Sequence, residues 1–223
     1  MRWIVHVALL FVTSSSTQQE GHAAVALPDV LSSPRRQCTA VAIGPEFGGF
    51  ALFAGGYTHG KGNNAASSGK AVDVFDKQGR RVSTMELAVS RGTMGGATWR
   101  DLAFFGGGQD AAKNNTDIVD IINVTSGEHT VERLSQPRAM VAAAAVGDLV
   151  FFAGGELAED ESRQGVSRES RRVDIYNARL RQWVGHDDAL SVARKKTAAA
   201  TAGGKVIFAG GYAEALHESV GTF

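Results

Sequence analysis

Four hydrophobic segments of this chain end in a pair of glycines, and the pairs recur with a period of about fifty residues. The paired residues are Gly55, Gly56, Gly106, Gly107, Gly154, Gly155, Gly210 and Gly211. A period of this length indicates that one supersecondary unit is used several times along the chain. It constrains the fold more than the activity, because repeat architectures are scaffolds whose function depends on variable loops.

Each glycine pair is preceded by the pattern Leu-x-x-x-Arg and then by a run of small residues. The arginines of this pattern are Arg35, Arg91, Arg138 and Arg194. After the small residues, a Gly-Asp turn at 147–148 or a Gly-Gly turn at 203–204 leads into a bulky segment that ends at the glycine pair. Such dipeptides between apolar runs are hairpin signals, because glycine reaches positive φ without a Cβ clash.

A third segment of each unit has an aspartate between two β-branched residues. These aspartates are Asp73, Asp120 and Asp174. A fourth segment then leads to the next Leu-x-x-x-Arg, and the apolar residues alternate with a period of two. We therefore predict four strands per unit, and no helix through the alanine-rich runs at 142–145 and 198–201.

Four-stranded antiparallel units repeated at this period are typical of blades arranged around an axis. The small residues of the first strand support this arrangement, because innermost strands converge near the axis. A sandwich with coincidental glycines is the alternative. We predict blades near residues 35–86, 91–133 and 138–189, and an incomplete blade from 194.

The units resemble kelch repeats over nearly all of the chain from Leu31 onward. Kelch units carry a glycine pair that closes the second strand, and a tyrosine and a tryptophan with six residues between them. Tyr176 and Trp183 reproduce that pair with six residues between them. The other units have different residues facing each other: Phe75 and Val82, and Ile122 and His129. The resemblance implies an all-β, kelch-type β-propeller at 27–223, with about three complete blades and a truncated fourth.

The arginines of Leu-x-x-x-Arg have two interpretations. They could pair with the aspartates of the third strands once per blade, which is a structural role. They could instead ring one mouth of the channel and bind an anionic ligand. Because they recur in every unit, we favour the structural role, and we expect functional residues among those that vary between units at that mouth, notably Arg36, Lys195 and Lys196.

The amino terminus differs in kind from the repeats. One positive charge at Arg2 precedes an apolar stretch at 3–12, and Ala24-Val25-Ala26 has the small-x-small pattern of a cleavage site. We interpret residues 1–26 as a secretory signal peptide, and a frayed apolar tail or a wrong start codon as the alternatives. The protein is then expected to be secreted.

Two N-x-[ST] sequons, at Asn114 and Asn123, would accept glycans in a eukaryotic secretory route. Asn114 lies in a predicted loop and is the better candidate, because Asn123 ends a strand. Cys38 is the single cysteine, so no intrachain disulfide can form.

The carboxyl terminus falls inside the fourth unit. Residues 220–223 take the place that the third strand takes in the earlier units. We expect either a fragment or a truncated gene model, or a protein that completes its ring by association, because open sheet edges are normally avoided.

Composition excludes several classes of function. The chain has 223 residues and a formal net charge of zero, which argues against a nucleic-acid surface or a polybasic membrane anchor. No apolar run is long enough to span a membrane. The histidines are scattered without metal-ligand spacing, so we predict no metal site, no cofactor and no catalytic set.

The longest predicted loop, at 156–172, contains both acidic and basic residues. We interpret it as a self-neutralising, solvated loop; a metal or carboxylate-pair site is the alternative. Certain kelch enzymes hold iron with Glu-x-x-x-Asp-x-x-x-His. Glu156 and Asp160 match two of these positions, but Gln164 stands in place of the histidine, so that activity is not carried over.

The resemblance implies a secreted scaffold that binds a protein or glycan partner. A small-molecule enzyme of the sugar-isomerase or oxidase kind, with part of its site missing, is the alternative. The loops after the glycine pairs are long and variable and emerge on one face, where binding sites are usually held. We predict recognition there by Arg36, Tyr57, His59, Arg163, Arg168, Lys195, Lys196, Tyr212 and His217.

Overall fold

The computed structural model describes residues 30–58, 67–158 and 168–213. Within them the chain is all-β, with one short 3-10 helix, η1 (Pro45–Phe47). The predicted signal peptide and residues 220–223 lie outside the described residues.

Three antiparallel sheets of four strands follow one another along the chain. The first sheet contains β1 (Thr39–Ala42), β2 (Ala51–Ala54), β5 (Ala71–Phe75) and β6 (Arg81–Glu86). The second contains β7 (Gly95–Trp99), β8 (Leu102–Gly106), β9 (Ile118–Asn123) and β10 (His129–Arg133). The third contains β11 (Ala142–Val146), β12 (Leu149–Ala153), β13 (Val173–Asn177) and β14 (Gln182–Asp187).

Two smaller elements complete the described part of the chain. A hairpin of β15 (Ala198–Ala202) and β16 (Lys205–Ala209) follows the third sheet, and β3 (Tyr57–Thr58) pairs with β4 (Ser67–Ser68) beside the first. The alanine-rich runs at 142–145 and 198–201 are strands, as predicted. Alanine is a poor strand former by itself, so the hairpin turns and the pairing with β12 and β16 decide their conformation.

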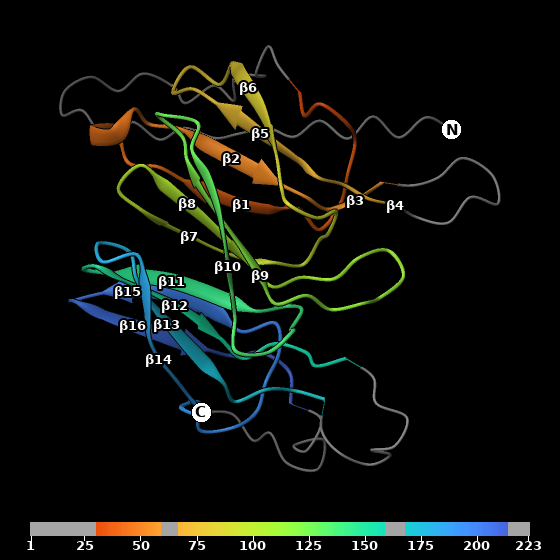
Figure 1. The fold of residues 1–223 in the computed structure, drawn as a ribbon, viewed down its shortest axis with the longest axis vertical. Helices are drawn as coiled ribbons and strands as arrows, with labels where there is room; N and C mark the ends of the chain where they lie inside the picture. The colour runs from red at the N-terminus through yellow and green to blue at the C-terminus, as the bar shows by residue number, and fades with distance from the viewer. Residues whose placement is uncertain (1–29, 59–66, 159–167, 214–223) are drawn as a thin grey trace, which may run out of the picture.

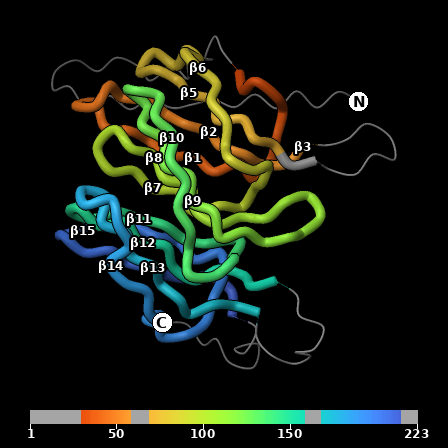
Figure 2. Tube along the Cα trace, in the orientation of Figure 1, coloured from red at the N-terminus to blue at the C-terminus, as the bar shows by residue number. Residues whose placement is uncertain are grey.

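The sheets stack on one another in sequence order. Figure 1 shows the first sheet at the top, the second below it and the third at the bottom, and the tube in Figure 2 shows the same succession of colours. The first strands of successive units, β1, β7, β11 and β15, are neighbours in that order. In the described residues, consecutive sheets therefore pack against each other through their first strands.

The second sheet is covered on both faces. Successive side chains of a strand point to opposite faces, so neighbouring residues of β8 lie in two different cores. Phe105 of β8 lies in the core shared with the first sheet, while its neighbour Phe104 lies in the core shared with the third. All five residues of β8 are buried. A strand covered on both sides reads as a continuous apolar run, which is what residues 102–105 show.

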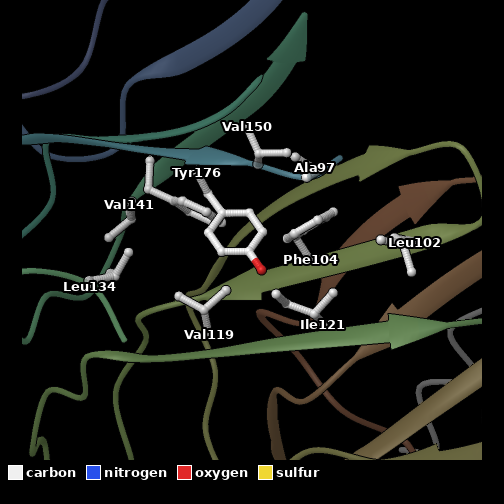
Figure 3. Packing of buried hydrophobic residues seen from close by; sticks show 11 residues of the cluster. Ala97, Leu102, Phe104, Val119, Ile121, Leu134, Val141, Val150 and Tyr176 are labelled. Atoms are coloured by element: carbon white, nitrogen blue, oxygen red, sulfur yellow. The ribbon is translucent and has the colours of Figure 1, made fainter. Parts of the chain in front are cut away.

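Tyr176 joins the second and third sheets. Its ring contacts Phe104 across the interface at 5.9 Å between centroids, and it meets Trp183 of its own sheet edge-on at 5.1 Å. Figure 3 shows the ring reaching between Phe104 and Val119. The tyrosine–tryptophan pair quoted for the kelch resemblance is thus a cross-strand pair of β13 and β14.

The glycine pairs of the three sheets each form a seam with the unit that follows. The second glycine donates its N–H to the carbonyl of the next arginine, as in Gly155 to Arg194 at 2.9 Å. The first glycine has φ near +60°, and a Cβ on Gly154 would lie 2.4 Å from the same carbonyl oxygen. Only glycine fits there, for both conformational and steric reasons.

The pair in the second unit is displaced by one residue from the sequence prediction. Gly107 and Gly108 carry the two positive φ angles and meet the carbonyl of Arg138, whereas Gly106 ends β8. Glycine is required at position 106 for a different reason: a Cβ there would lie 2.4 Å from the ring of Phe152. The structural pair is therefore 107–108 and not 106–107.

The first unit corrects a second expectation. Phe75 faces Arg81 and not Val82, because a β-bulge interrupts the pairing of β5 with β6. The expected facing of Ile122 and His129 in the second sheet is confirmed.

The seam predicts that alanine substitutions at two glycines of the same backbone conformation, Gly147 and Gly107, lower the unfolding free energy by different amounts. Gly147→Ala places a methyl group in open space at φ +57°, and we expect it to cost about 1–2 kcal/mol of unfolding free energy. Gly107→Ala adds a Cβ 2.4 Å from a backbone oxygen, and we expect a loss of about 4 kcal/mol or more.

Urea denaturation of both variants measures the difference. Equal losses would show that the steric contact at the seam contributes nothing.

Candidate functional site

The two ends of the strands form two different faces. At one end, on the left in Figure 1, the strands are joined by short turns such as 100–101 and 147–148. At the other end lie the segments after β2, β8 and β12 and the links that carry Leu-x-x-x-Arg. We call this second end the loop face, because the segments that follow the glycine pairs begin there.

The Leu-x-x-x-Arg arginines of the three sheets each form an ion pair with the third-strand aspartate of the same sheet. Arg35 contacts Asp73 at 2.7 Å, and Arg91 contacts Asp120 at 2.5 Å. Arg138 pairs in the same way with Asp174. All of these charged side chains are buried.

The same carboxylates hold the beginning of each link. The N–H of the residue after the leucine donates to them: Ser32 to Asp73, Ala88 to Asp120 and Ser135 to Asp174. Both ends of the Leu-x-x-x-Arg pattern are thus tied to one carboxylate. The arrangement explains why leucine, arginine and aspartate recur in phase.

The pairing decides between the two interpretations of these arginines. Arg138 is fully buried, and burial lowers its pKa to about 10, although Asp174 opposes that shift. Its guanidinium also donates to the carbonyls of Gly154 and Arg172. A side chain bound in this way has no surface for an external anion, so the role of Arg91 and Arg138 is structural.

Asp73 is held in its charged form. Burial by itself raises the pKa of Asp73, but hydrogen bonds from Ser32 and Arg35 outweigh it and leave the pKa below its usual value. A depressed pKa means that the pair stabilises the fold above the unfolded pKa and loses this contribution as the pH falls through the folded one.

A second repeated feature lies at the start of each first strand. Gln37, Thr93, Met140 and Lys196 all have φ between 54° and 57°. Their backbones form a ladder in which each N–H donates to the carbonyl one unit earlier, as in Met140 to Thr93 at 2.8 Å. Left-handed residues other than glycine are uncommon, and here each unit supplies one to join its neighbour.

The residue after each glycine pair bridges to the residue after the arginine. The pairs are Arg36 with Tyr57, Gly92 with Gln109, Ala139 with Glu156, and Lys195 with Tyr212. These four bridges place equivalent positions of the four units side by side on the loop face. Their side chains differ between units, which is what a recognition surface requires.

Tyr57 is built into the interface with the second sheet. It is 8% exposed, its hydroxyl donates to the carbonyl of Gln109 at 2.7 Å, and its ring fills the space above Gly92. Tyr57 therefore positions neighbouring units. Tyr212, at the equivalent place in the hairpin, is 39% exposed.

On the loop face, four charged side chains and one tyrosine form a cluster: Glu156, Arg168, Glu169, Lys195 and Tyr212. The Lys195 ammonium lies 2.5 Å from Glu156 and 3.4 Å from Glu169. Arg168 lies 3.7 Å from the same oxygen of Glu156. Lys195 also lies 5.4 Å from the centre of the Tyr212 ring. The third sheet and the hairpin both contribute to this loop-face cluster.

The electrostatics fix the protonation state of the lysine. Burial lowers the pKa of Lys195, but hydrogen bonds and charge from Glu156 and Glu169 outweigh it and raise the pKa above its usual value. Lys195 is therefore a held cation at neutral pH, and not the neutral amine that a Schiff-base nucleophile requires. Its chemistry is that of ionic and hydrogen-bonded recognition.

The structure brings together some of the predicted residues and separates others. Arg168, Lys195 and Tyr212 meet in the loop-face cluster. Lys196 follows Lys195 in the chain and is exposed, whereas Arg36 is exposed in the first unit, where it bridges to Tyr57. Three predicted residues, His59, Arg163 and His217, fall outside the described residues.

Two members of the cluster were missed. Glu156 was assigned to a solvated loop but is buried beside Lys195, and Glu169 received no role although it is 4% exposed. The distance of Glu169 from the glycine pair along the sequence gives no indication that it lies beside Lys195.

The two sequons differ in accessibility. Asn114 is exposed, and its amide donates to Asp110 beside it in the loop. Asn123 is half-buried, donates to Asp101, and accepts two backbone N–H groups of the turn that follows it. A glycan on Asn123 would break this turn network, whereas Asn114 needs only to rotate.

Within residues 30–58, 67–158 and 168–213, no group of three histidine, cysteine or acidic residues is placed to hold a metal ion. In the same ranges no helix is long and apolar enough to cross a membrane. Comparison with protein-family models gives no matching family, and comparison with curated proteins gives no match.

The buried pairs predict a strong asymmetry between two Asp→Asn substitutions. Asp174→Asn leaves the Arg138 charge buried without its counter-ion, and we expect a loss of about 3–5 kcal/mol of unfolding free energy. Asp148→Asn breaks the solvent-exposed pair with Arg179 and is expected to cost less than about 1 kcal/mol.

Chemical denaturation at pH 7 compares the two variants. A small effect of Asp174→Asn would contradict the structural role of the repeated pair.

Proposed function

We propose that this protein is a secreted, kelch-type β-propeller scaffold that binds a protein or glycan partner through its loop face. The loop-face cluster is the observation that carries the proposal. It combines a held cation, two buried carboxylates and an exposed aromatic ring on the ends of packed strands. Exposed tyrosines and oriented charges are the groups that recognition sites favour.

The propeller part of the proposal rests on the arrangement of the units. Three four-stranded antiparallel sheets and a hairpin stack in sequence order, and their first strands are neighbours. The backbone ladder and the glycine seam repeat between all of them. Such nearest-neighbour stacking is what blades around an axis require. The enzymatic alternative has no observation in its favour among the described residues.

The first test is a screen of the intact chain against a glycan array and a displayed peptide library. For a ligand found there, we expect Tyr212→Ala and Lys196→Glu each to weaken binding by about tenfold, because Tyr212 is the exposed ring of the cluster and Lys196 is an exposed cation next to Lys195 in the chain. Lys195→Glu is a poor test, since it would add a third carboxylate beside Glu156 and Glu169.

Titration calorimetry measures the affinities, and Asp148→Asn on the turn face is the matched control. Raising the ionic strength should weaken binding further if the exposed lysine contributes charge. If Asp148→Asn lowers the affinity and the loop-face variants do not, the ligand binds the turn face, and the proposed site on the loop face is wrong.

The proposed secretory route makes a separate prediction. Expression of the full chain in eukaryotic cells should release into the culture medium a protein that begins at Leu27. This protein should carry an N-glycan on Asn114 but not on Asn123, because Asn114 is exposed and Asn123 is half-buried. Peptide mapping after glycosidase treatment locates the glycan, and Asn114→Gln should abolish the mobility shift. Retention of the full chain inside the cell would refute secretion.

A further inference from the structure

A narrow groove lies between the second and third sheets, at the end of the strands opposite the loop face. Leu102 and Ile121 give it apolar walls, and Thr130, Tyr176 and Arg181 contribute polar side chains. The space between these side chains is sufficient for about one water molecule. Size and polarity together restrict the occupant to a small molecule that forms hydrogen bonds.

An exposed ion pair joins the two sheets beside this groove. Arg181, in the turn between β13 and β14, donates to both carboxylate oxygens of Glu128 at 3.0 and 3.4 Å. Glu128 immediately precedes β10, so the pair crosses from the third sheet to the second. Both side chains line the groove and are exposed, and solvent therefore has access to it.

The Tyr176 hydroxyl is the buried polar group of the groove. Tyr176 is 3% exposed, and its ring contacts Phe104 and Trp183. Figure 3 shows the hydroxyl pointing between Val119 and Ile121, whose side chains cannot accept a hydrogen bond. Burial raises the pKa of this phenol, and within the described residues no hydrogen bond to it opposes that shift. Buried hydroxyls without a partner are costly and rare in folded proteins.

The hydroxyl is specific to the third unit. The residue two positions after the third-strand aspartate is Phe75 in the first sheet and Ile122 in the second, and both are buried. A phenylalanine in place of Tyr176 would fill the same space without a polar atom. Packing of the ring alone therefore does not account for the tyrosine.

Thr130 supplies a second hydroxyl from the other sheet. It lies directly opposite Ile121 in the pairing of β9 with β10, so the two side chains share one face of the second sheet. This is the face toward which Tyr176 points, because Ile121 belongs to the core between the second and third sheets. A threonine hydroxyl can both donate and accept a hydrogen bond.

We propose that the groove is a binding site for one ordered water molecule that joins the second and third sheets. The water accepts a hydrogen bond from the Tyr176 hydroxyl and donates to the Thr130 hydroxyl and the Glu128 carboxylate. Three hydrogen bonds are typical of a water that forms part of a protein structure. The site lies at the opposite end of the strands from the loop-face cluster and does not depend on the proposed function.

A crystal structure of the full chain that resolves ordered solvent is the direct test. We expect a water within about 3.2 Å of both the Tyr176 and the Thr130 hydroxyl oxygens. A Tyr176 hydroxyl bonded directly to a protein group, or no water within reach of it, would overturn the proposal.

A double-mutant cycle tests the shared water in solution. Tyr176→Phe and Thr130→Val each remove one hydroxyl and keep the shape of the side chain. Because both hydroxyls bind the same water, loss of one reduces what the other contributes. The double variant should therefore lower the folding equilibrium constant by a smaller factor than the product of the two single effects, with a difference of about threefold or more.

Urea denaturation of the full chain measures these equilibrium constants. The matched control combines Tyr176→Phe with Thr125→Val, since Thr125 is an exposed threonine of the β9–β10 turn that does not line the groove. The effects of the control pair should multiply. If the effects of Tyr176→Phe and Thr130→Val multiply in the same way, the two hydroxyls share no water and the proposal is wrong.

Discussion

The buried ion pair between the link arginine and the third-strand aspartate is the interaction on which the architecture depends. Taking two charges out of water is costly, and each pair is supported by further hydrogen bonds, from a backbone N–H to the carboxylate and from the guanidinium to backbone carbonyls. In the third sheet Arg138 reaches Asp174 and two carbonyls, and Ser135 returns a backbone N–H to the same carboxylate. One carboxylate thus fixes the first strand, the third strand and the link between units.

The pair and the glycine seam meet at the same residue. The carbonyl of Arg138 accepts the N–H of Gly108, while its side chain is held within its own sheet. The arginine therefore connects the interior of its unit to the unit before it. This double role explains why a glycine pair and a Leu-x-x-x-Arg pattern recur together in every unit, and why stability is expected to be shared between neighbours.

The sequence allowed the all-β class and the limits of the sheets to be predicted, because a period of two and glycine turns are local signals. The alanine run at 142–145 was predicted correctly as a strand from its place in the repeat. The predicted position of a repeat residue was wrong by one where a residue of the same type is required nearby for another reason, or where a bulge shifts the strand pairing. Gly106 is required by the Phe152 ring, so three glycines in a row concealed the true pair, and the bulge at Val82 changed the facing of Phe75.

The candidate site was less predictable than the fold. Lys195 could be chosen because its position varies between units, and Tyr212 because it follows a glycine pair on the long-loop face. The burial of Glu156 and Glu169 depends instead on a bridge between these two residues, which no local pattern indicates. The seam has a consequence for how such a chain can change in length. Each unit contributes a glycine pair to the junction with the next unit and a Leu-x-x-x-Arg link to the junction with the unit before it. A duplication of one full repeat, wherever in the repeat it begins, therefore adds both the glycine pair and the link that a new junction needs. Units can thus be added without redesigning the neighbours, while the loop-face side chains of the copy are left to diverge.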